Sequence, residues 1–159
     1  MVRILKTTLI IFALALLGCA TGPKFKPAPA APEGYATIYF LNFSFDGLAY
    51  PPRLFCANSE KVASLRFGGY TSITAKPGEY IFNLGGILNG CLEDYINAKS
   101  EYKISGDVKS GGIYIVQFYS VDSGNYITYN MQFGKFEEKS TPKERLQNSR
   151  YNQPLRDNI

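Results

Sequence analysis

Histidine and tryptophan are absent from this 159-residue chain, and only three cysteines and two methionines are present. Without histidine, the chain cannot build a Ser-His-Asp or Cys-His catalytic arrangement, and it has no imidazole to offer a metal ion. The glycine pairs Gly68-Gly69, Gly85-Gly86 and Gly111-Gly112 lack the Lys-Ser/Thr ending of a phosphate-binding loop, so we expect turns there. The sequence predicts no catalytic residue, no cofactor and no metal site, and therefore a protein that is not an enzyme.

A strong excess of positive charge is also lacking. Lysine and arginine number 17 against 13 acidic residues, a formal net charge of +4, but Arg3 and Lys6 belong to the N-terminal segment considered next. No basic stripe runs through the remaining sequence, whose charge is close to neutral. We therefore expect no nucleic-acid partner, and no motif points to a small-molecule substrate.

The N-terminus has the layout of a secretory signal peptide. Arg3 and Lys6 precede an apolar run over residues 9–17 (LIIFALALL), which is too short for a membrane-spanning helix of about 20 residues. The run ends in Leu16-Leu17-Gly18-Cys19, which resembles the lipobox of bacterial lipoproteins. This resemblance implies that residues 1–18 are removed and that Cys19 is acylated, and Ala20 after the cysteine implies the outer membrane. The alternatives are an ordinary secretory signal or a short uncleaved anchor.

Proline and alanine dominate the segment that follows Cys19, residues 19–33. Such a composition favours extended polyproline II over a packed structure. At about 3.1 Å per residue, this linker would reach up to roughly 40 Å. We therefore expect it to hold the folded body away from the membrane surface.

Residues 34–134 are rich in aromatic and β-branched residues, which suit pleated surfaces. Turn signals recur every eight to twelve residues, and no helix long enough for a parallel crossover is apparent, so we predict an all-β antiparallel sandwich of seven or eight short strands. The strand at 35–43 is apolar at nearly every position and should be central and buried on both faces. The other expected strands lie near residues 53–57, 62–67, 70–75, 79–84, 99–108, 113–121 and 126–133.

Two further segments are expected outside the sandwich. A long loop covers 85–98, with at most a short helical turn. From 135 to 159 the chain is polar and contains Pro142 and Pro154, so we expect a disordered tail, with a short helix over 141–150 as the alternative.

Cys56 and Cys91 remain once Cys19 is assigned to lipid attachment. An even pair in an exported protein predicts a disulfide. Two free buried thiols are the alternative, whereas metal binding by two cysteines without histidine is disfavoured.

A family resemblance covers about residues 35–120. The stretches ATIYFLN, PRLFCANSEKVASLRFGGYTSITAKPGEYIF and KISGDVKSGGIYIVQF are similar to an uncharacterised bacterial envelope family, domain of unknown function 2846. The motifs that carry it are Tyr39, Gly69-Tyr70, Pro77-Gly78-Glu79-Tyr80 and Gly111-Gly112-Ile113-Tyr114. The resemblance implies a transthyretin-like or prealbumin-like sandwich and no established activity. The long loop with Cys91 and the C-terminal tail depart from the family pattern.

These features favour a lipid-anchored, non-enzymatic protein of the cell envelope, held at the outer membrane with its domain in the periplasm or on the cell surface. Its partner would be another envelope protein, bound through loops or an exposed sheet edge. One alternative is a subunit of a secretion or surface machine, because the small lipoprotein of type VI secretion also combines a lipid anchor with a transthyretin-like sandwich. Another is an unrecognised cell-wall hydrolase, and the tyrosines could stack on sugars.

The lipid anchor predicts a single site of acylation. Metabolic labelling with a clickable fatty acid should mark the wild-type protein and leave Cys19→Ala unlabelled, because Cys19 is the acylation site that the lipobox implies. Equal labelling of both proteins would contradict the lipobox assignment.

Overall fold

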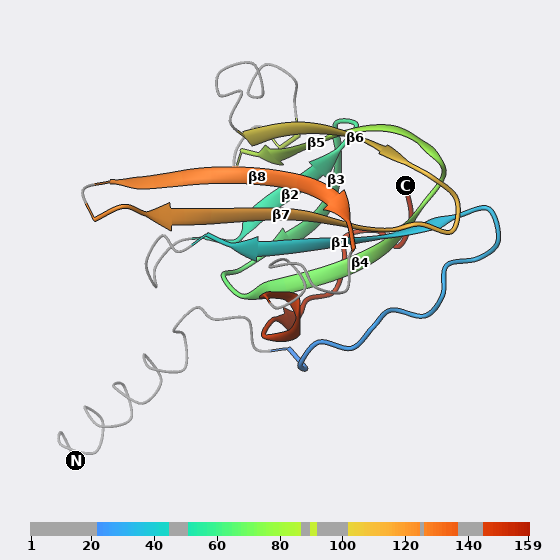
Figure 1. Ribbon diagram of the computed structural model, residues 1–159, viewed down its shortest axis with the longest axis horizontal. Helices are drawn as coiled ribbons and strands as arrows, with labels where there is room; N and C mark the ends of the chain where they lie inside the picture. The colour runs from blue at the N-terminus through green and yellow to red at the C-terminus, as the bar shows by residue number, and fades with distance from the viewer. Residues whose placement is uncertain (1–21, 45–50, 87–89, 92–101, 125, 137–144) are drawn as a thin grey trace, which may run out of the picture.

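The computed structural model describes residues 22–44, 51–86, 90–91, 102–124, 126–136 and 145–159 (Figure 1). The predicted leader, Cys19 and most of the 85–98 loop lie outside these residues. Within the described part of the chain, no helix is long and apolar enough to cross a membrane.

The described residues form two packed β-sheets, which confirms the predicted all-β sandwich. Sheet A has five strands in the order β8-β7-β1-β4-β9, and sheet B has four in the order β3-β2-β5-β6. The strands are β1 (Ala36–Phe43), β2 (Arg53–Ala57), β3 (Glu60–Leu65), β4 (Gly69–Ala75), β5 (Gly78–Gly85), β6 (Lys103–Val108), β7 (Ile113–Asp122), β8 (Ile127–Lys135) and β9 (Arg150–Tyr151).

Two strand pairs correct the expectation of an antiparallel sandwich. β1 pairs with β7 in parallel, and so does β4 with β9, whereas the other pairs are antiparallel. Parallel neighbours need a long crossover connection, commonly a helix. Here all the strands of sheet B lie between β1 and β7 in the chain, so strands form the crossover connection. The absence of a predicted crossover helix therefore did not exclude a parallel pair.

The main core lies between the two sheets. β1 occupies the centre of sheet A, as predicted, and its Phe40 ring packs edge-on against Phe55 and Phe82 of sheet B at 5.8 and 5.9 Å between centroids. All three rings are fully buried. Phe40 therefore joins the two sheets at the middle of the sandwich.

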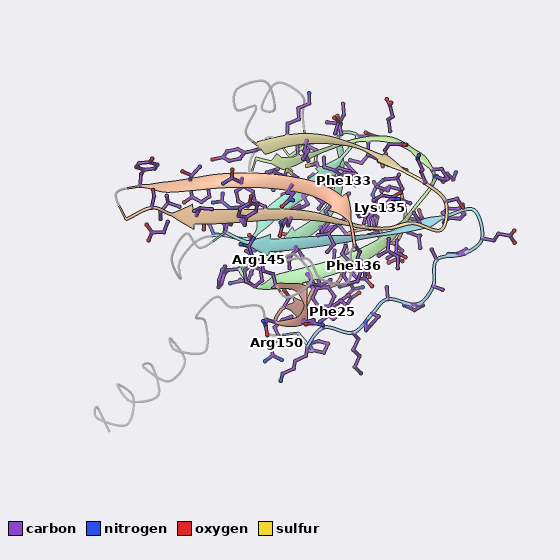
Figure 2. All side chains as sticks on the ribbon, viewed as in Figure 1. Phe25, Phe133, Lys135, Phe136, Arg145 and Arg150 are labelled. Carbon is purple, nitrogen blue, oxygen red and sulfur yellow. A yellow bond between two sulfur atoms is a disulfide. The ribbon has the colours of Figure 1, made fainter. Side chains whose placement is uncertain are left out.

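A stack of four aromatic rings closes the side of the sandwich where β6 meets β8. Tyr80, Phe82, Phe133 and Tyr114 follow one another nearly parallel, with successive centroids 5.8, 5.3 and 5.3 Å apart. Phe133, labelled in Figure 2, comes from β8 and lies against the backbone of Gly106 in β6, where a Cβ would overlap its ring. Glycine at 106 is therefore required by this packing.

The disulfide between Cys56 and Cys91 is present, as predicted, with the two Cα atoms 5.8 Å apart. It joins β2 to the loop after β5 across a sequence separation of 35 residues. Closing a loop of this length lowers the conformational entropy of the unfolded chain and thereby stabilises the folded state by roughly 4 kcal/mol.

The close packing at Gly106 can be tested against a matched glycine. Gly106→Ala should lower the free energy of unfolding by about 1–3 kcal/mol, because the Phe133 ring is held between two others and cannot yield. Gly134→Ala, in β8, adds a Cβ that meets nothing within 4 Å and should leave stability unchanged or raise it by up to about 1 kcal/mol. Chemical denaturation measures both, and equal effects would contradict the packing argument.

Candidate functional site: the N-terminal strap

The outer face of sheet A, which points away from sheet B, is apolar at its centre. Tyr39 and Leu41 of β1, Tyr70 of β4 and Ile115 of β7 form a second buried cluster there. Leu41 is fully buried and Tyr39 is 4% exposed. Sheet B covers only the inner face of sheet A and would leave these side chains exposed to water. Other parts of the chain must therefore cover them.

Residues 22–34, here called the N-terminal strap, provide part of this cover. Phe25 packs edge-on against Tyr39 and Tyr70, at 5.8 and 5.3 Å between ring centroids. The Lys26 and Ala28 amides donate to the hydroxyls of Tyr70 and Tyr39, at 3.0 and 2.8 Å. In Figure 1 the strap is blue and curves round from below β4 to the start of β1. The expectation of a free spacer is corrected here: an extended segment leaves its amides unpaired, and these two tyrosines accept hydrogen bonds from them.

The C-terminal segment adds to this cover, as does Phe136 after β8, whose ring centroid lies 5.8 Å from that of Tyr39. A helical turn at 145–147 places Leu146 in the second cluster, fully buried. β9 then pairs with the start of β4, and the Tyr151 amide donates to the Pro23 carbonyl at 2.8 Å. The expectation of a disordered tail is therefore wrong for residues 145–159. Their polar composition conceals three apolar anchors, Leu146 and Tyr151 at the second cluster and Ile159 at the main core, and backbone hydrogen bonds that composition does not reveal.

A cavity of about 470 Å³ lies between the strap and sheet A. Its polar side chains are few: Thr37, Tyr39 and Gln147. The remaining lining is apolar or backbone and comes from Phe25, Pro27, Ala28, Pro29, Ala30, Ala31, Gly111, Gly112, Ile113 and Phe136. This volume is in the range of small-ligand pockets, and its lining suits an apolar group better than a charged one.

Tyr39 is the titratable group of this cavity. Burial raises the pKa of Tyr39 above the ordinary value of 10.0; the hydrogen bond from Ala28 opposes this effect and the nearby Tyr70 adds to it. The hydroxyl therefore stays protonated near neutral pH, where it serves as a hydrogen-bond acceptor for the strap. The cavity thus offers shape and apolar contact rather than acid–base chemistry.

The predicted site residues are not brought together by the fold. Cys56 belongs to β2 of sheet B and Cys91 to the loop after β5, on the other layer from the strap, and Cys19 lies outside the described residues. Among the described residues, no group of three potential metal ligands is found. Tyr39, Tyr70 and Tyr114 accept hydrogen bonds from backbone amides, and Tyr80 donates to the Lys76 carbonyl. These hydroxyls therefore have structural partners.

Phe25 and Leu146 were missed because each stands alone in a polar or proline-rich stretch. One signal could have found them. The strand at 36–43 is apolar on both faces, and an all-β sandwich of two layers covers only one of them. The second apolar face of this strand predicts that further segments cover it. Isolated apolar residues outside the strands are the candidates for this cover.

Comparison of the chain with protein-family models, with curated proteins and with solved structures finds no match. The resemblance to domain of unknown function 2846, and the transthyretin-like topology that it implies, stay predictions. Function is therefore argued from the site itself.

The strap contacts predict a local effect of one substitution. Phe25→Ala removes the ring between Tyr39 and Tyr70. The free energy needed to detach the strap from sheet A should therefore fall by about 1–2 kcal/mol. Exchange of the Lys26 and Ala28 amides should accelerate roughly 10-fold, as measured by hydrogen exchange with mass spectrometry. Leu155→Ala, at a side chain 55% exposed, is the control and should change neither amide. Unchanged exchange in Phe25→Ala would show that the ring does not hold the strap.

Proposed function

We propose that this protein is a lipid-anchored, non-enzymatic binding module of the bacterial cell envelope. The leader with its Leu16-Leu17-Gly18-Cys19 ending supports the anchor, and Ala20 favours the outer membrane. The single observation that carries the binding role is an exposed apolar hairpin formed by β7 and β8.

This hairpin extends beyond the rest of sheet A. The last pair between β1 and β7 is Phe43 with Tyr119, whereas β7 and β8 continue to pair as far as Asp122 with Ile127. Figure 1 shows the ends of β7 and β8 projecting past the other strands. Among the strands that the structure describes, only β7 and β8 pair at the tip.

The described residues of the tip expose apolar side chains and are joined by hydrogen bonds. Val121, Tyr126 and Ile127 are 48%, 68% and 45% exposed. The Gly124 amide donates to the Asp122 carboxylate at 2.7 Å, and the Ser123 hydroxyl donates to the Tyr126 carbonyl at 2.9 Å.

The apolar side chains are spread over both faces of the hairpin tip. Val121 and Ile127 point to opposite faces, because Val121 pairs with Thr128 and Asp122 with Ile127. A small projecting tip of this kind suits insertion into an apolar groove of a partner protein.

The proposal is tested by crosslinking in intact cells. A photoreactive amino acid in place of Tyr126 should yield a discrete adduct with one envelope protein, identified by mass spectrometry. The matched control carries the same photoreactive group in place of Ile81, which is 41% exposed in β5 of sheet B, and should yield no such adduct. Val121→Asp should weaken the Tyr126 adduct at least 10-fold, whereas Leu155→Asp should not.

Two outcomes would contradict the binding role. One is the absence of any discrete adduct at position 126, and the other is the same adduct at positions 126 and 81. Because all the substituted side chains are exposed, the thermal unfolding temperature should stay nearly constant and thereby separate loss of binding from loss of fold.

A further inference from the structure

The strap limits how far the folded body can stand from its anchor. The Pro23 carbonyl is bonded to the Tyr151 amide, and Gly22 approaches the Tyr151 carbonyl so closely that no side chain would fit. Cys19 precedes Gly22 by three residues, which span at most about 11 Å when fully extended. An acylated Cys19 would therefore hold the β9 side of sheet A next to the bilayer, instead of the roughly 40 Å expected of a free linker.

The same place gathers positive charge from three distant parts of the sequence. Lys24 and Arg150 face each other in a β-bridge, and Lys26 follows on the strap. Arg150 also pairs with Gly69, whose amide donates to the Arg66 carbonyl. All four side chains are exposed, and we call this group the basic edge. Figure 2 shows Arg150 close to Phe25 on the strap.

No described carboxylate neutralises the basic edge. The ion pairs among described residues join Asp107 to Lys109 and Glu60 to Arg156, and none involves these four cations.

The described acidic residues lie elsewhere in the fold. Glu60, Glu79 and Asp107 belong to sheet B, and Asp122 to the hairpin tip. Asp157 bonds to Thr74, near the end of β4 remote from Gly69. Glu33 precedes β1, whose first residue pairs with the last residue of β4, so it too lies at that remote end.

We infer that the basic edge binds the anionic headgroups of the membrane that carries the anchor, so that the body is held against the bilayer in one orientation. This inference rests on the proposed lipid anchor. A cation close to an anionic membrane surface strengthens association by about fivefold. The four cations belong to the strap and to the residues hydrogen-bonded beside it, so contact of this side of the fold with the bilayer would bring them within a Debye length of the headgroups, about 8–10 Å.

The test uses the mature protein purified from membranes and added to preformed vesicles. One set of vesicles is phosphatidylcholine alone, and the other contains 30% phosphatidylglycerol. An uncharged amine-acylating reagent then labels exposed lysines, and mass spectrometry compares Lys24 and Lys26 with Lys61 on sheet B. We expect Lys24 and Lys26 to react at least about fivefold more slowly on the anionic vesicles, Lys61 to be unchanged, and 0.5 M salt to abolish the difference.

A double variant shows whether the fold assembles the basic edge. Arg66→Ala/Arg150→Ala should reduce the protection of Lys24 and Lys26, although both arginines are remote from them in sequence. Lys103→Ala/Lys109→Ala removes two exposed cations near sheet B as the matched control and should leave the protection intact.

The outcomes distinguish failure of headgroup binding by the basic edge from failure of the lipid anchor. Failure of the protein to float with either vesicle would contradict the lipid anchor. Flotation with equal labelling of Lys24, Lys26 and Lys61 would overturn the inference while leaving the anchor in place. Equal protection on neutral and anionic vesicles would also overturn it, since closeness to the bilayer would then require no headgroup charge.

Discussion

Tyr39 and Leu41 point away from the sandwich core, and covering them is the constraint on which the rest of the structure depends. β1 lies at the centre of sheet A and is buried along almost its whole length, with Ile38 and Phe40 facing sheet B. Full burial of one large apolar side chain stabilises a fold by about 1.5–3 kcal/mol. An uncovered outer face would lose several such contributions. The N-terminal strap and the C-terminal segment pack on this face and preserve them.

The two ends also hold each other. Phe25 from the strap and Leu146 from the C-terminal segment share one apolar cluster, and the Tyr151 amide bonds to Pro23. A segment whose composition suits a flexible spacer thereby becomes part of the sandwich. Because the proposed acylation site is three residues from this cover, the proposed anchor would couple membrane attachment to folding, and the basic edge would lie at the membrane.

Interior packing leaves little room for chemistry between the sheets. The four stacked rings from Tyr80 to Tyr114, with Gly106 beneath Phe133, fill the side where β6 meets β8. The features available for interaction are therefore at the periphery: the β7–β8 tip, the cavity under the strap and the basic edge. This distribution agrees with a protein that binds through its surface.

Local sequence determined β1 to β8, because alternation, turn residues and β-branched content act over a few neighbouring residues, but it did not indicate β9. It also indicated that 36–43 is central and that Cys56 and Cys91 can pair. Only the tertiary structure decided that β1 and β7 are parallel, that Phe25 and Leu146 share a cluster, and that Arg66, Lys24 and Arg150 lie together. Each of these depends on contacts between segments far apart in the chain, and no local pattern specifies which distant surface an isolated side chain will meet.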